Sequence, residues 1–291
     1  MPSKKLLIAL VTILTLPSAF PTTVALRASR TDQSQCSVGG GVNPYAGLIF
    51  DTAGNLFGTT LLGGRYHDGS VFELTPGANG KWNKTSPHTF DCTDGAYPYA
   101  GLISDAAGNL YGTTEGGGRR NFGNVFALTP SADGKWTKTL LHTFTGKDGA
   151  QPFSTLIFDS AGNLYGTTYG GGSYLGGVVF KLAPGANGKW TETVLYSFHD
   201  DGESPTSGLI FDSAGNLYGA AAYGALGYGS IFQLTSQADG TWKETMLHAF
   251  DRKDGMWPYA SSRGEGTVFK LTPGANDKWT ETVLHIFYGS Q

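Results

Sequence analysis

A tryptophan followed eight residues later by a phenylalanine occurs five times along the chain. The pairs are Trp82/Phe90, Trp136/Phe144, Trp190/Phe198, Trp242/Phe250 and Trp279/Phe287. The tryptophans of successive pairs are separated by 54, 54, 52 and 37 residues. A fixed period of this length is typical of repeat architectures in which each copy forms one small sheet. The spacing therefore predicts a tandem array of similar structural units.

The third copy shows the expected strands of one unit most clearly. Apolar runs at 156–159 and 164–168 flank turn residues at 160–163, which predicts a β-hairpin. A Gly-rich loop, a third run at 178–182 and a second turn at 184–188 lead into an alternating strand at 190–198. We therefore predict an all-β fold, a β-propeller of four complete four-stranded blades plus one incomplete blade. Their approximate bounds are 41–94, 95–148, 149–201, 202–254 and, for the incomplete blade, 255–291.

Composition agrees with many short strands joined by tight turns. The 291 residues include 44 glycines, while 15% of residues are charged and 13% are aromatic. The formal net charge is −3, and no basic run is present. A mildly acidic chain of this kind argues against nucleic acid as a partner.

The N-terminus has the pattern of a secretory signal peptide. Lys4 and Lys5 precede an apolar stretch from Leu6 to Leu16, and small residues follow up to Ala25. The stretch is interrupted well short of the ~20 residues that a membrane span needs. We predict a signal peptide over 1–25, a linker over 26–40, and export to a secreted, periplasmic or cell-surface location. No stable membrane span is expected once the signal is removed.

Two cysteines, Cys36 and Cys92, occupy similar places before successive Pro-Tyr-Ala triplets. In an exported protein a disulfide between them is the default expectation. Two unpaired thiols are the alternative, because the Cα separation that a bridge requires cannot be derived from the sequence.

Three short motifs recur in nearly every copy and carry a family resemblance. In the first copy they are GLIFD at 47–51, GNLFGTT at 54–60 and SVFELTP at 70–76. The pattern resembles the GloVer tandem repeat family of exported bacterial proteins, over about residues 40–288. The resemblance implies a secreted or surface repeat protein, and it supplies no established catalytic residues.

The fifth copy lacks one hairpin. Phe250 and Phe269 are 19 residues apart, whereas Phe144 and Phe180 are 36 apart. The incomplete blade would either pack as an extra hairpin against the ring or leave exposed edges that pair with another chain. A sequencing or gene-truncation artefact would also explain the gap.

The repeated polar residues have structural explanations. In four copies a histidine stands two residues before the last Phe: His88, His142, His248 and His285. Tyr196 takes that place in the third copy. Histidines on separate outer strands cannot converge on one ion, so we expect strand-face aromatics, no metal site and no cofactor. Asp51, Asp105, Asp159 and Asp212 are expected to cap the turns that they precede. The regular tryptophans are expected to pack between blades.

No Gly-x-Ser-x-Gly, phosphate-loop or His-Glu-x-x-His motif occurs, so the sequence predicts no catalytic residue. An enzyme stays open as the less favoured reading.

The copies differ most in the loops expected at one face of the propeller. A variable surface on a constant scaffold is typical of recognition, although unconstrained loops also drift. The candidate ligand-binding residues are Arg65, Tyr66, Tyr97, Arg119, Arg120, Tyr174, Tyr228 and Trp257. The first hypothesis is a binding or adhesion module for an extracellular glycan or protein. The alternatives are a structural subunit that self-associates through the incomplete blade, and a propeller-type hydrolase or lyase.

Overall fold

The computed structural model describes residues 41–199, 204–224, 226–251, 258, 266–273 and 279–287. The predicted signal peptide, the linker, Cys36 and Trp257 lie outside these residues. The chain divides into two compact units, one formed by Cys36–Ser262 and one that contains Arg263–Gln291. Among the described residues, no helix combines the length and apolar character that crossing a membrane requires.

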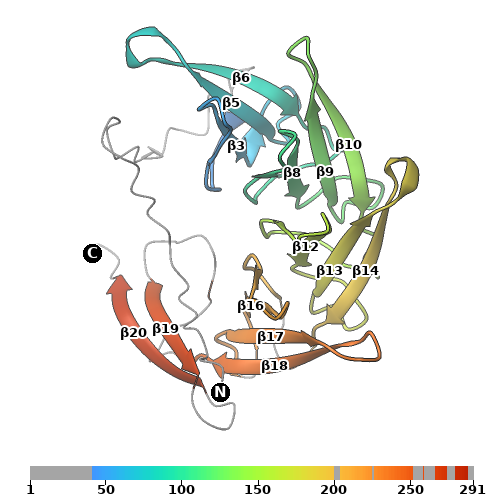
Figure 1. Cartoon of the computed structure of the whole chain (residues 1–291), viewed down its shortest axis with the longest axis vertical. Helices are drawn as coiled ribbons and strands as arrows, with labels where there is room; N and C mark the ends of the chain where they lie inside the picture. The colour runs from blue at the N-terminus through green and yellow to red at the C-terminus, as the bar shows by residue number, and fades with distance from the viewer. Residues whose placement is uncertain are drawn as a thin grey trace. The chain divides into compact units, whose positions relative to one another are not determined.

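Within the described residues of Cys36–Ser262, four four-stranded antiparallel sheets follow one another along the chain (Figure 1). The first contains β2 (Ile49–Phe50), β3 (Leu56–Thr60), β5 (Ser70–Pro76) and β6 (Trp82–Thr89). The second contains β7 (Ile103–Ser104), β8 (Leu110–Thr114), β9 (Asn124–Pro130) and β10 (Trp136–Thr143). The third contains β11 (Ile157–Phe158), β12 (Leu164–Thr168), β13 (Val178–Pro184) and β14 (Trp190–Ser197). The fourth contains β15 (Ile210–Phe211), β16 (Leu217–Ala221), β17 (Ser230–Ser236) and β18 (Trp242–Ala249).

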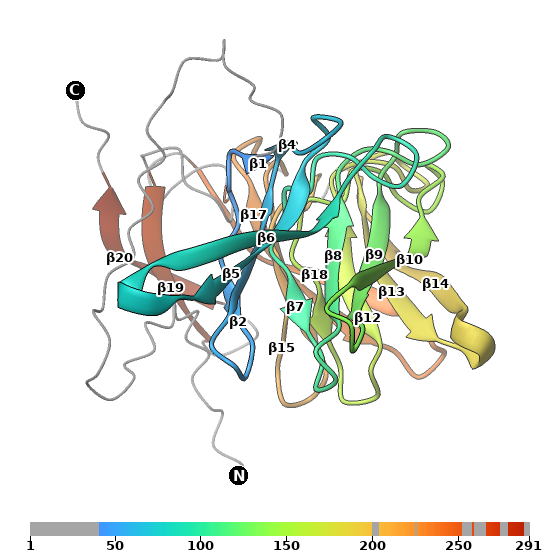
Figure 2. The same cartoon turned by 90° about the horizontal axis from the view of Figure 1, so that it is seen from above.

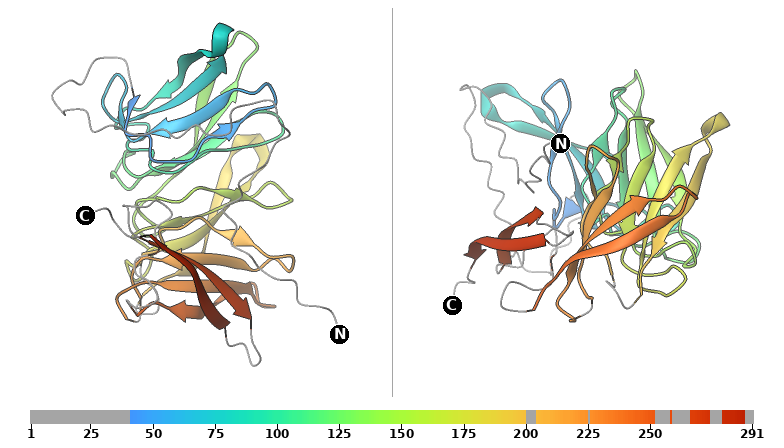
Figure 3. Two further views of the ribbon diagram at one scale, coloured as in Figure 1. Left: turned by 90° about the vertical axis from the view of Figure 1, so that its left-hand side faces the viewer. Right: turned by 60° about the horizontal axis from the view of Figure 1, so that its bottom comes forward.

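Smaller elements complete the described structure. A two-residue strand β1 (Gly41–Val42) pairs with β4 (Leu62–Gly63). Single 3₁₀ turns, η1 (Ala78–Gly80) and η2 (Ala186–Gly188), join the third and fourth strands of the first and third sheets. The second unit holds β19 (Gly266–Pro273) and β20 (Trp279–Phe287), two antiparallel strands drawn in red (Figure 3).

The predicted strand plan of one repeat is therefore confirmed, with two adjustments. The first strand of each sheet is only two residues long, shorter than the apolar run that predicted it. In the fifth copy, the described residues form the last two strands of a repeat, β19 and β20. Consecutive four-stranded antiparallel sheets give the unit Cys36–Ser262 a propeller-like architecture.

The core lies between neighbouring sheets. The phenylalanines that end the first four repeats are almost fully buried, and those of the first three pack edge-on against a phenylalanine of the next repeat. The pairs are Phe90–Phe126, Phe144–Phe180 and Phe198–Phe232, with ring centroids 5.1, 5.2 and 4.9 Å apart. Trp136 packs against Phe57 of the preceding repeat, with centroids 5.6 Å apart, which confirms the predicted packing role for this tryptophan. Trp82, in the first repeat, is 44% exposed.

A glycine in the second strand makes room for this packing. A Cβ at Gly166 would lie 2.7 Å from Cζ of Phe180 and 2.8 Å from Cδ2 of Leu156. The ring of Phe180 therefore occupies the space that any side chain at this position would need.

The predicted aspartate turns are also confirmed. In the third repeat, Oδ1 of Asp159 accepts hydrogen bonds from the backbone N–H groups of Ala161 and Asn163, both at 2.9 Å. Its Oδ2 accepts a 3.0 Å hydrogen bond from the Tyr165 hydroxyl. The aspartate thus ties the first turn to the second strand.

The fourth strand of each sheet carries a β-bulge. Leu140 pairs with Phe126 and His142 pairs with Val125, so one extra residue, Leu141, interrupts the register. The register shifts at the same place in the other repeats. Because side chains alternate along a strand, an extra residue reverses the face to which all later side chains point. Pro87 lies at the bulge of the first repeat, where a missing N–H is tolerated.

Candidate functional site

Loops from neighbouring repeats are joined by a repeated pair of backbone hydrogen bonds. The N–H of Tyr97 donates to the carbonyl of Asp68 at 2.8 Å, and the N–H of Glu115 donates to the carbonyl of Tyr97 at 3.0 Å. Gln151 and Ser204 make the equivalent two bonds in the next copies. The loops after the second strand and the loops between repeats therefore lie at one end of the sheets, as predicted (Figure 2). We call residues 43–47, 61–69, 91–101, 115–123, 145–155, 169–177, 204–208, 222–224 and 226–229 the loop end.

Most of the predicted ligand-binding residues present exposed side chains at the loop end. The exposed ones are Arg65, Tyr66, Tyr97, Arg119, Arg120 and Tyr174. Tyr228 is half-buried, and Trp257 lies outside the described residues. Arg65 lies over the ring of Tyr66, 5.4 Å from its centroid, and Tyr174 contacts the ring of His199 at 4.6 Å. The first contact lies within the first repeat and the second within the third, so neither joins two repeats.

A row of aromatic rings crosses the repeats at the loop end. The ring of Tyr45 stacks on Tyr99, with centroids 5.2 Å apart and planes inclined by 14°. Tyr99 meets Phe153 edge-on at 5.3 Å, and Phe153 meets Tyr169 at 5.5 Å. Burial first, and then the nearby Tyr223 of the fourth repeat, raise the pKa of the Tyr169 hydroxyl. The structure therefore links rings from three repeats into one aromatic row.

Sequence reasoning missed this row. It singled out the variable Tyr97, whereas the row uses Tyr45 and Tyr99 from the recurring Pro-Tyr-Ala triplet. The signal was the recurrence of an aromatic residue after proline in three successive copies, including Phe153 after Pro152.

A shallow cleft of about 520 Å³ lies between loops of the second and third repeats. Phe122, Gln151, Gly170 and Leu175 are among its lining residues. Leu175 is 76% exposed and adopts φ = 67°. The volume lies within the range of small-molecule sites.

The histidines lie at a second place, between neighbouring sheets. Before the bulge in the fourth strand, the side chain of Lys138 faces the preceding repeat and lies 5.3 Å from the ring centroid of Phe90. After the bulge, His142 faces the following repeat. One strand therefore contributes to two different interfaces between repeats.

The interface between the first and second repeats holds an ion-pair network. Nε2 of His88 lies 2.8 Å from Oδ2 of Asp94, and Nζ of Lys138 lies 3.3 Å from the same oxygen. The Lys138 ammonium also donates to the Asp94 carbonyl, and its side chain is only 8% exposed. Burial alone would raise the pKa of Asp94, but hydrogen bonds from His88 and the Asp91 backbone, with the charge of Lys138, hold it below the usual value. The positive charge of Lys138 therefore compensates the negative charge of Asp94 in this network.

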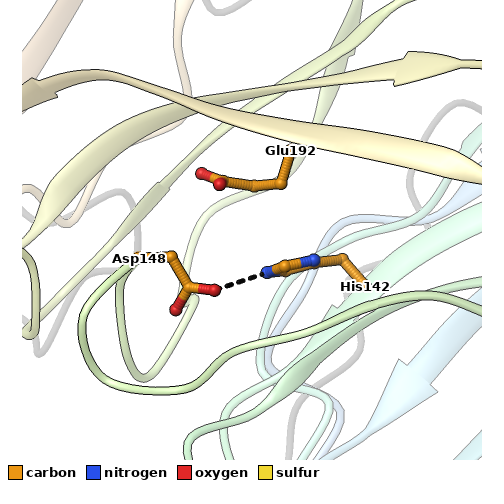
Figure 4. A group of neighbouring side chains, drawn as sticks. All are labelled: His142, Asp148 and Glu192. Atoms are coloured by element: carbon orange, nitrogen blue, oxygen red, sulfur yellow. Dashed lines mark hydrogen bonds and ion pairs between the residues drawn. The ribbon is translucent and has the colours of Figure 1, made fainter.

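The interface between the second and third repeats also contains a histidine–aspartate pair, but a glutamate takes the place of the lysine. Nε2 of His142 lies 3.1 Å from Oδ2 of Asp148, and Glu192 on β14 faces this pair (Figure 4). One ligand-type atom from each of the three residues lies within 4.8 Å of the other two. Oδ1 of Asp148 accepts bonds from the backbone N–H and hydroxyl of Thr145, at 2.8 and 2.9 Å.

The electrostatics of this His142–Asp148–Glu192 cluster differ from those of the first interface. Burial, and then the charge of Asp148, raises the pKa of Glu192 to about 7. Burial lowers the pKa of His142, against the opposing effect of Asp148. Two acids and a neutral imidazole therefore share a partly buried volume.

The sequence predicted that the histidines of the fourth strands would not converge on one another, and His88 and His142 lie at two different interfaces. It did not anticipate that Asp148 and Glu192 would join His142. The available signal was an acid six residues after the histidine, combined with a lysine-to-glutamate change two residues after the tryptophan.

Cys92 is exposed, and its thiol donates a hydrogen bond to Oδ2 of Asp68 at 3.3 Å. This hydrogen bond and the charge of Asp68 raise the pKa of the thiol. Cys36 lies outside the described residues, so its pairing with Cys92 stays a prediction.

These features define an all-β tandem-repeat protein built from four-stranded antiparallel sheets with polar clusters between repeats. The model of the Gloeobacter/Verrucomicrobia repeat matches residues 43–263, and the chain belongs to that family. No curated protein matches the sequence. A crystal structure of a protein of unknown function from Dyadobacter fermentans DSM 18053 is similar over 84% of this chain and 81% of that one. Its TM-score of 0.46 and 10% identity carry no functional inference.

Proposed function

We propose that this chain is an exported, non-catalytic binding protein that takes a glycan at the loop end. The aromatic row is the single observation that carries the proposal. Rings from successive repeats form a continuous series, and its first member, Tyr45, is 52% exposed. A tyrosine combines an apolar face with a polar hydroxyl, which suits a sugar ring that has apolar C–H faces and a polar rim.

The surroundings of the row support the same chemistry. Arg119 and Arg120 are exposed in the loop of the second repeat, and Tyr174 is 61% exposed in that of the third. Binding residues are often carried by loops on a rigid scaffold, and the backbone hydrogen bonds between repeats supply that rigidity here. An extended polymer fits a row better than a compact metabolite does, because contacts recur at each repeat.

A glycan array probed with the purified chain lacking residues 1–25 tests this function. We expect binding to a polysaccharide, with an affinity loss of tenfold or more in Tyr45→Ala and Tyr99→Ala, and a smaller loss in Arg119→Ala. Phe50→Ala is the matched control, because Phe50 is an exposed aromatic residue on β2, outside the loop end. Binding that is equal in all variants would refute the proposed site. Release of reducing sugar from a bound glycan would instead favour the hydrolase or lyase.

A second function, assembly of copies of the chain, is favoured by the exposed aromatics of the first repeat. Phe50 is 62% exposed and Trp82 is 44% exposed. Their counterparts Phe158 and Trp190 pack against Tyr111 of the preceding repeat, at 5.1 and 6.4 Å. The fifth copy lacks the hairpin that would supply such an aromatic residue. We propose a second copy of the chain as the partner for this face.

Light scattering after size-exclusion chromatography tests the assembly. A dimer or larger species that Trp82→Ala converts to monomers would support it, whereas a wild-type monomer would refute it. The two functions are separable, because Tyr45→Ala should leave the mass in solution unchanged.

A further inference from the structure

One register position carries opposite charges at two neighbouring interfaces. The residue two positions after the tryptophan is Lys138 in the second repeat and Glu192 in the third. Both face a histidine and an aspartate of the preceding repeat. The first interface thus brings its own cation to the His–Asp pair, while the second brings another carboxylate.

The second interface is left without charge compensation. With a neutral imidazole, Asp148 and Glu192 together carry a charge of −2 when both are ionised. Partly buried carboxylates that face each other repel strongly unless a proton or a cation lies between them.

One oxygen of the cluster has its hydrogen-bonding capacity unused. Oε1 of Glu192 is buried, with less than 1 Å² exposed, and has no hydrogen-bond partner within the part of the chain that the structure describes. Buried polar atoms are seldom left in this state, because an unmade bond costs about 1–3 kcal/mol. This orphan oxygen indicates that a group other than the protein satisfies it.

We propose that His142, Asp148 and Glu192 bind a divalent cation, Zn²⁺, in the interface between the second and third repeats. The donors are Nε2 of the imidazole and one oxygen from each carboxylate. One nitrogen and two oxygens are ligands that zinc accepts, with water in the fourth position. The ion would supply the positive charge at this interface, as the Lys138 ammonium does at the preceding one.

The geometry requires only side-chain adjustment. In a tetrahedral site with bonds of about 2.0–2.1 Å, ligand atoms are separated by about 3.3 Å. Nε2 of His142 and Oδ2 of Asp148 are already 3.1 Å apart, and all three ligand atoms lie within 4.8 Å of one another. Thr145 holds the other oxygen of Asp148 and so orients the carboxylate as an outer partner.

This site goes beyond the proposed glycan binding and is independent of it. The ion would cross-link β10 and its following loop to β14, which belong to two successive repeats. Its consequence is a metal-dependent stability of the repeat array, because an ion that binds only the folded chain stabilises it more as the ion concentration rises above the dissociation constant.

Zinc titration of the EDTA-treated, full-length mature chain tests the proposal, followed by calorimetry and by elemental analysis after dialysis. We expect one tight zinc per chain and a zinc-dependent rise in melting temperature. Glu192→Gln, nearly identical in shape, should weaken the tight binding at least tenfold, and so should Asp148→Asn. Glu244→Gln is the matched control, since Glu244 has the same register in the fourth repeat but meets a repeat with Tyr196 in place of the histidine.

A gain-of-site variant provides a second readout. Lys138→Glu should create a second cluster with His88 and Asp94 and raise the stoichiometry from one zinc to two. Circular dichroism verifies that each variant folds. No zinc bound by the wild type, or equal binding by wild type and Glu192→Gln, would overturn the proposal. The first of these outcomes would leave a shared proton as the occupant of the cluster.

Discussion

Replacing Glu192 by Gln should stabilise the metal-free chain at pH 8 and affect it little at pH 5. Burial first, and the charge of Asp148 second, raise the pKa of Glu192 from 4.5 to about 7. An acid whose pKa is higher in the folded state releases its proton more easily when unfolded. The folded state is therefore progressively destabilised as pH rises above 4.5, and the cost levels off above about pH 7.

The magnitude follows from the size of that rise. At 1.36 kcal/mol for each tenfold change in acidity, an increase from 4.5 to about 7 corresponds to about 3 kcal/mol. Glu192 is half-buried, so solvent screens part of the repulsion, and about 1–2 kcal/mol is the expected gain in Glu192→Gln at pH 8. For a chain of this size, the melting temperature would rise by about 2–8 °C.

Urea unfolding with EDTA at pH 5 and pH 8 measures the effect. The lowered pKa of His142 destabilises the folded state as pH falls below 6.5, but that cost is common to both proteins and largely cancels in the comparison. With excess zinc the order should reverse, because only the wild type retains all three ligands. An equal gain at both pH values, or a loss at pH 8 without metal, would refute the electrostatic reasoning.

Three further changes test the scaffold. Gly166→Ala should cost about 1–3 kcal/mol in urea unfolding, because its Cβ would overlap the ring of Phe180. Asp159→Ala should cost about 1–3 kcal/mol, since it removes the four hydrogen bonds that the carboxylate accepts, and proteolysis should reveal a loosened hairpin. Lys138→Met should raise the pKa of Asp94 measured by NMR, because the ammonium that lowers it is lost.

The strands could be predicted from the sequence because their signal is local and repeated. The runs at 164–168 and 178–182 correspond closely to β12 (Leu164–Thr168) and β13 (Val178–Pro184). The aspartate turns followed from the chemistry of a single side chain and its nearest backbone groups. Averaging over four copies strengthened each of these inferences.

The bulge and the polar clusters could not be predicted in the same way. One extra residue at Leu141 leaves the apolar pattern of the strand nearly unchanged, yet it reverses the face on which His142 lies. The residues that meet there, Asp148 and Glu192, belong to different repeats, and their proximity depends on how two sheets pack. A long-range contact of this kind has no signature in a single copy.

The bulge also gives the array a direction and an order. β10 offers Lys138 to the repeat before it and His142 to the repeat after it, and β14 offers Glu192 to the repeat before it. Each of these two interfaces therefore takes its polar groups from both neighbouring copies. Duplicating the second repeat would set a lysine against His142 and Asp148, and so remove the proposed zinc site without altering either copy. The order of the copies, rather than the sequence of any one of them, thus determines which interfaces contain a compensating lysine and which need a cation from solution.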